Sequence, residues 1–88
     1  MAVELSATTA AVRLWVPRGA AGDLAGGARR VLEGVRVVER VESLAVEGFR
    51  PTATDIRVEL RAEVALASDA DAHDLEDGFG VVEATLDA

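Results

Sequence analysis

Alternating apolar and charged residues at positions 55–67 constrain the fold more than any other segment of the chain. The apolar side chains occupy every second position: Ile56, Val58, Leu60, Ala62, Val64 and Leu66. Between them lie Ala65 and four charged residues that alternate in sign: Arg57, Glu59, Arg61 and Glu63. Because successive side chains of a β-strand point to opposite faces, this run predicts a long antiparallel strand with one buried and one solvated face.

The amino-terminal part contains a shorter alternating run over residues 11–16, which we predict to be the first secure strand. Its apolar residues are Val12, Leu14 and Val16. Pro17 ends it, because proline cannot donate a hydrogen bond to a neighbouring strand. Val3 and Leu5 alternate on the opposite parity, so we expect a bulge or turn at residues 8–10.

A helix is predicted after Asp23, which is a suitable N-cap residue. One apolar stripe follows at helical spacing: Leu24, Ala28, Val31 and Leu32. Gly34 is a plausible end for this helix. The pair Gly26 and Gly27 weakens the helix but would let it sit closely against a sheet.

The middle of the chain favours another strand. Residues 37–46 are rich in valine, which favours a strand over a continued helix. Residues 48–54 contain Pro51 and several polar residues, so we predict a connection there. We expect Phe49 to cover an edge of the core.

The carboxy-terminal part predicts a short helix and a last strand. The helix would lie near residues 70–77, be capped by Ser68 or Asp69, and use Leu75 and Phe79 as apolar anchors. Residues 81–86 predict a last strand. Alternation along it would turn the side chains of Val82, Ala84 and Leu86 toward the core.

These elements predict one domain over residues 1–88. Their order is strand, helix, strand, strand, helix, strand, which is the ferredoxin-like βαββαβ pattern. We therefore expect an α/β sandwich of the α+β class, with two layers, an antiparallel sheet, one main helix and one short helix.

Composition favours a protein that associates with further copies of itself. Hydrophobic residues make up 50% of the 88 residues, but aromatic residues only 3%. A small chain whose core is built from alanine and valine buries little apolar area. We therefore favour a homo-oligomer or another protein partner.

Charge and cysteine content exclude several classes of function. The net charge is −7 and the pI is about 4.5, which argues against nucleic-acid binding. The chain has no cysteine, so disulfides and thiolate chemistry are excluded. No run approaches the length of a membrane-spanning helix, and we expect a soluble, cytoplasmic protein that does not bind membranes.

The weak candidates for a metal site are Asp69, Asp71 and His73. They share the opening Asp-x-Asp spacing of an EF-hand loop, but Asp74 stands where that loop needs glycine and Gly80 where it needs glutamate. The favoured interpretation is a solvated loop that caps a helix.

Catalytic signals are sparse. His73 is the only histidine and there is no lysine, so serine nucleophiles lack a convincing base. The loop from Gly19 to Gly22 lies between a strand and a helix, but Asp23 would repel a phosphate there. We expect no catalytic residues and no cofactor.

The predicted interface consists of Trp15, Phe49 and the charged face of the long strand, namely Arg57, Glu59, Arg61 and Glu63. A single tryptophan such as Trp15, beside Arg13, is typical of an interface anchor. Core packing and stacking on a ligand are the alternative roles for this ring. The charged face could also be an ordinary solvated surface with cross-strand ion pairs.

Two functions follow as hypotheses. The first is a small non-catalytic interaction or assembly module that self-associates. The second is a small-ligand-binding oligomer, for storage or regulation. The strand–helix–strand–strand portion from Val12 to Leu66 resembles dodecins, small flavin-storing shells, although residues 37–46 carry no aromatic ring to stack on a flavin.

Overall fold

The computed structural model describes residues 6–67 and 69–87 of the chain. Along the sequence the elements are β1 (Ser6–Pro17), the short 3₁₀ helix η1 (Arg18–Ala20), α1 (Leu24–Glu33), β2 (Val38–Pro51), β3 (Asp55–Leu66), α2 (Ala72–Glu76) and β4 (Val81–Asp87).

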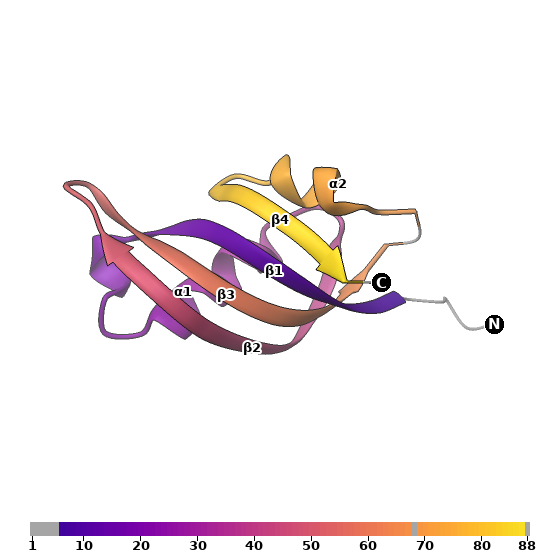
Figure 1. The fold of residues 1–88 in the computed structure, drawn as a ribbon, viewed down its shortest axis with the longest axis horizontal. Helices are drawn as coiled ribbons and strands as arrows, with labels where there is room; N and C mark the ends of the chain where they lie inside the picture. Colours follow the sequence, from indigo (N-terminus) through magenta and orange to yellow (C-terminus); the bar gives the residue numbers. More distant parts are fainter. Residues whose placement is uncertain (1–5, 68, 88) are drawn as a thin grey trace.

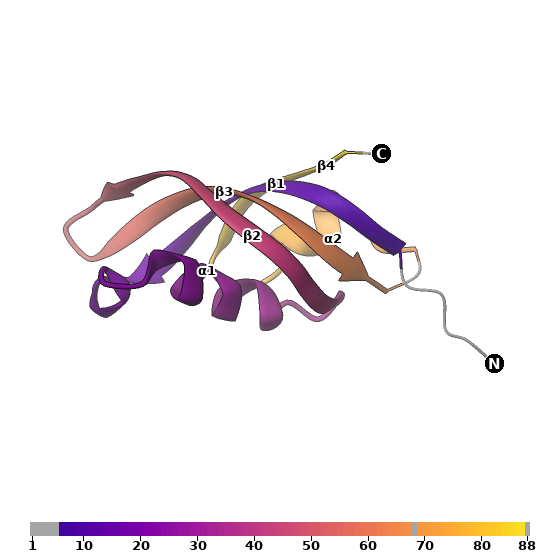
Figure 2. The ribbon, with the colours of Figure 1, turned by 90° about the horizontal axis from the view of Figure 1, so that it is seen from below.

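The strands form one antiparallel sheet in the order β2-β3-β1-β4 (Figure 1). Figure 2 shows α1 and α2 on the same side of this sheet. The prediction of an α+β protein with a four-stranded antiparallel sheet and two helices is confirmed. One face of the sheet is packed against the helices, and no described helix lies on the other.

The core lies between the sheet and the two helices. The even-numbered residues of β3 are buried, as the alternating pattern predicts, and Val12, Leu14 and Val16 of β1 join them. Leu32 of α1 and Leu75 of α2 close the core from the helix side. The period of two therefore reports a single buried face on each central strand.

The start of α1 agrees with its sequence signals. The side chain of Asp23 accepts a hydrogen bond from the backbone N–H of Gly26 at 2.9 Å. Gly27 is buried, and a Cβ added there would lie 2.9 Å from the Cβ of Ala20. Gly27 thus permits a close approach to η1 and β1, whereas a Cβ at Gly26 would meet the side chain of Asp23. Gly34 follows the last helical residue.

Two predictions about β1 and β2 are wrong. β1 pairs with β3 without interruption from Ser6 to Pro17, so there is no bulge or turn at residues 8–10 of that pairing. Val3, Leu5 and Ala7 suggested it; the first two lie outside the described residues, and Ala7 pairs with Ala65 in the uninterrupted register. β2 continues to Pro51 instead of ending before Gly48, because an edge strand can accept a proline at its end.

The predicted start and anchors of the second helix are also partly wrong. Asp71, not Ser68 or Asp69, caps α2; its side chain accepts a hydrogen bond from the N–H of Asp74, whose side chain accepts one in return. Leu75 is fully buried, but Phe79 is 98% exposed because it lies beyond the end of the helix.

Two other apolar residues lie outside the core, contrary to the predictions. Arg13 pairs with Glu83 and Leu14 with Val81, so Val82 is the extra residue of a β-bulge and is exposed. Phe49 is 61% exposed and does not cover a core edge.

Among the described residues, neither helix has the length and apolar character needed to cross a bilayer.

Candidate functional site: the helix-free face of the sheet

The face of the sheet that carries no helix is made of rows of side chains from neighbouring strands. The strand register places the residues of each row opposite one another. We call this surface the open face and define it by Thr9, Ala11, Arg13, Trp15, Ser43, Ala45, Gly48, Arg50, Arg57, Glu59, Arg61, Glu63, Glu83 and Thr85.

One end of the open face is aromatic and basic. Trp15 and Arg57 are register partners on β1 and β3, and the guanidinium carbon of Arg57 lies 4.6 Å from the centroid of the indole ring. Such a cation–π contact holds the arginine over the ring. Arg50 of β2 is paired with Arg57 from the other side, so two positive charges lie together near the β2–β3 connection.

The middle of the open face contains ion pairs within the sheet. The guanidinium of Arg13 lies 3.4 Å from a carboxylate oxygen of Glu59 and 3.9 Å from one of Glu83, so it links β3, β1 and β4. Arg61 lies 3.6 Å from Glu47 of β2. The charges in the middle rows therefore largely compensate one another.

The opposite end of the open face is acidic. Glu63 has Thr9 and Ser43 as its register partners, and neither carries a charge. Within the part of the chain that is described, none of the ion pairs includes Arg50, Arg57 or Glu63. The open face is thus polarised along the strands, with uncompensated charges of opposite sign at its ends.

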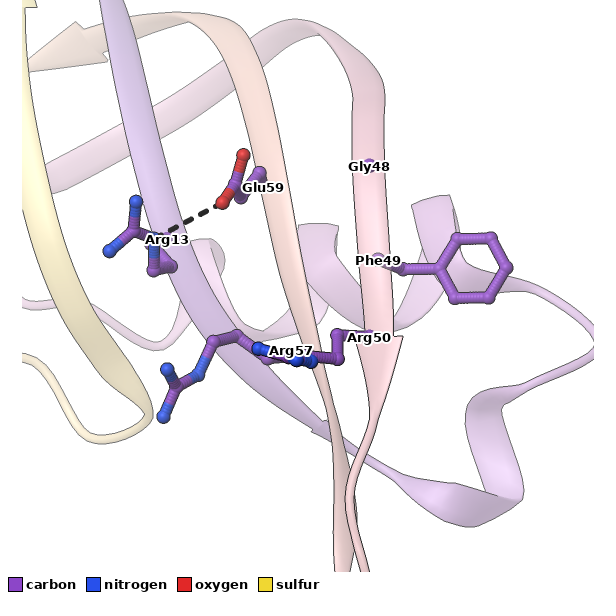
Figure 3. A pocket seen from close by; sticks show the side chains of 6 residues that line it. All are labelled: Arg13, Gly48, Phe49, Arg50, Arg57 and Glu59. Atoms are coloured by element: carbon purple, nitrogen blue, oxygen red, sulfur yellow. Dashed lines mark ion pairs between the residues drawn. The ribbon is translucent and has the colours of Figure 1, made fainter.

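Each end also contains a shallow hollow. Figure 3 shows the hollow at the basic end, where the ion pair of Arg13 and Glu59 lies beside Arg57 while the ring of Phe49 points away from them. The hollow at the acidic end is lined by residues that include Thr9, Ser43, Ala45, Arg61 and Glu63. Thr9, Ser43 and Ala45 contribute the small side chains of this hollow.

The structure brings five of the six predicted interface residues onto the open face: Trp15, Arg57, Glu59, Arg61 and Glu63. Phe49 is the exception, because it pairs with Val58, whose side chain is buried on the helix side. Sequence reasoning missed Arg13, Arg50 and Glu83 as members of this surface. Of these, only Arg13 gave a signal, since it has the same parity as Trp15.

The candidate metal ligands do not converge. The side chain of Asp71 is occupied in capping α2, and Asp69 lies before it with a positive φ of 72°. The imidazole of His73 is exposed, with its Nδ1 atom 4.0 Å from a carboxylate oxygen of Glu76. Over residues 6–67 and 69–87, no three side chains of histidine, cysteine, aspartate or glutamate are grouped to hold a metal ion.

No family model, curated protein or solved structure matches the chain, so its function is inferred from the geometry of its own residues.

Proposed function

We propose that this protein is a small non-catalytic module that self-associates through the open face of its sheet. The observation that carries the proposal is the unbalanced charge at the two ends of that face, with Arg50 and Arg57 at one end and Glu63 at the other. Complementary potentials steer association and select orientation. Trp15 would supply the aromatic anchor that interfaces favour.

We also propose that its architecture is ferredoxin-like. The element order along the chain and the strand order β2-β3-β1-β4 support this arrangement. A sheet of this kind that carries both helices on one side leaves its other side available for a partner.

The edge of β2 supports association through the face instead of strand addition. Three register shifts interrupt its pairing with β3, and the extra residues are Glu39, Glu42 and Glu47. Bulges and charged residues on an edge strand hinder pairing with another strand. The second edge, β4, is only seven residues long.

Size-exclusion chromatography with light scattering tests this proposal. We expect the wild-type protein to have at least twice the 9.2 kDa of one chain. Trp15→Ala, on the open face, should shift the mass toward the monomer, whereas the control Phe79→Ala, on an exposed turn, should not. Circular dichroism verifies that both variants are folded.

Three results would count against the proposal. A wild-type protein that is monomeric at high concentration contradicts self-association. An association that is lost in Phe79→Ala and kept in Trp15→Ala would assign the interface to another surface. A chromophore that elutes with the protein would instead favour a small-ligand-binding oligomer.

A further inference from the structure

We infer that two copies of this chain meet open face to open face around a two-fold axis that crosses the strands near Val12 and Leu60. The inference rests on the proposed function and adds the symmetry and the register of the contact. Its basis is the order of charges along β3 together with the sizes of the side chains along β1.

The charges of β3 are self-complementary when the strand is reversed. A two-fold axis that lies in the plane of contact and runs across the strands places each strand antiparallel over the same strand of the second copy. Arg57 then lies opposite Glu63 of the second copy, and Glu59 lies opposite Arg61. Four of the five charged positions of the strand meet a charge of opposite sign, and the fifth, Asp55, lies opposite Ala65. A parallel superposition of the two strands would place each charged residue over the same residue of the second copy, and therefore over a like charge.

Side-chain size agrees with the same axis. On β1, the register with β3 places Trp15 in the row of Arg57 and Thr9 in the row of Glu63. The two-fold axis therefore places the ring of Trp15 over Thr9 of the second copy, at the hollow of the acidic end, whose lining includes the small residues Ser43 and Ala45 beside Arg61 and Glu63. In the next rows inward, Arg13 lies over Ala11.

The dimensions of the sheet fit this contact. Six residues separate Arg57 from Glu63, so each lies about 10 Å from the axis along the strand. Stacked sheets are about 10 Å apart and cross at about 30°. The crossing displaces the paired residues sideways by about 5 Å, which the long arginine and glutamate side chains span.

The open face has an area close to that of a standard protein–protein interface. β1 and β3 have 12 residues each, so they are about 40 Å long, and four strands about 4.8 Å apart give a face of roughly 700 Å². A standard interface buries about 800 Å² on each partner. Because its pairs are charged and near solvent, this interface should weaken as the salt concentration rises.

Two charge-reversal variants test the register. Arg57→Glu and Glu63→Arg each create two like-charge contacts per dimer, so each alone should dimerise at least about tenfold more weakly than the wild type. An equimolar mixture of the two variants should form heterodimers, because residue 57 of one chain again meets an opposite charge at residue 63 of the other. Native mass spectrometry distinguishes the heterodimer from either homodimer.

A matched mixture provides the control. Combining Arg57→Glu with Glu59→Arg leaves two like-charge contacts in the heterodimer, so no recovery is expected. If the wild type dimerises but the first mixture shows no preferential heterodimer, this register is wrong while self-association stands. If the wild type does not associate at all, the proposed function itself fails.

Discussion

Replacing Leu75 with alanine should destabilise the protein strongly, because this residue connects α2 to the core. Leu75 has 0% of its surface exposed and is the only buried residue of α2. Removing a buried leucine side chain typically costs about 2–5 kcal/mol through lost transfer energy and the cavity left behind. A chain of this size has a free energy of unfolding of roughly 4–13 kcal/mol in total.

Urea unfolding followed by circular dichroism measures this loss. With an m-value of about 1 kcal/mol per molar urea, Leu75→Ala should lower the midpoint by about 2–5 M or leave the protein unfolded. Leu75→Met is the control, since a swap of similar volume costs less than about 1.5 kcal/mol. Protein concentration must be fixed because association adds to stability. A loss below about 1 kcal/mol for Leu75→Ala would refute the packing of α2 on the sheet.

Three further substitutions test local features. Asp71→Ala removes the cap of α2 and should lower the free energy of unfolding in urea by about 0.5–2 kcal/mol. The control Asp71→Asn keeps a capping oxygen and should lower it much less. Equal losses in the two variants would argue against the capping role. Gly27→Ala should lower the melting temperature. Overpacking against Ala20 destabilises the fold by about 1–3 kcal/mol, which exceeds the stabilisation of about 1 kcal/mol from the higher helix propensity of alanine. A rise in melting temperature would show that Ala20 moves aside. Arg13→Met should change the free energy of unfolding by no more than about 1 kcal/mol, because the ion pairs of Arg13 are partly exposed to solvent. A larger loss would mean that these ion pairs are better shielded from solvent than the structure indicates.

Hydrophobic periodicity predicted the regular parts of the fold. Residues 55–64 alternate without interruption and predict β3, although Ala65, which follows them, is buried as well. Asp23 and Gly34 similarly marked the ends of α1 because capping depends on nearby residues. In these segments the same local pattern determines both the element and its buried face.

Features that depend on pairing between strands could not be predicted in this way. The bulge that exposes Val82 exists only in the register of β4 with β1, so parity within β4 placed the residue on the wrong face. Phe79 follows Leu75 at helical spacing, but α2 ends at Glu76, and Gly80 adopts a positive φ of 90°. Helical periodicity therefore no longer applies at Phe79.

Only the part of the candidate site that lies on β3 was predictable from the sequence. Parity within β3 correctly grouped Arg57 with Glu63, because both lie on one strand. The contributions of Arg50 and Glu83 come from the edge strands and required the observed register. The polarity of the open face is therefore a property of the assembled sheet.

Acrylamide quenching of Trp15 fluorescence across a dilution series tests the central claim most directly. Trp15 is the only tryptophan and lies on the open face, so its emission reports that surface alone. If two copies meet through this face, quenching should increase on dilution in step with the fall in molecular mass. A mass that falls while quenching remains constant would show that the copies associate through a different surface.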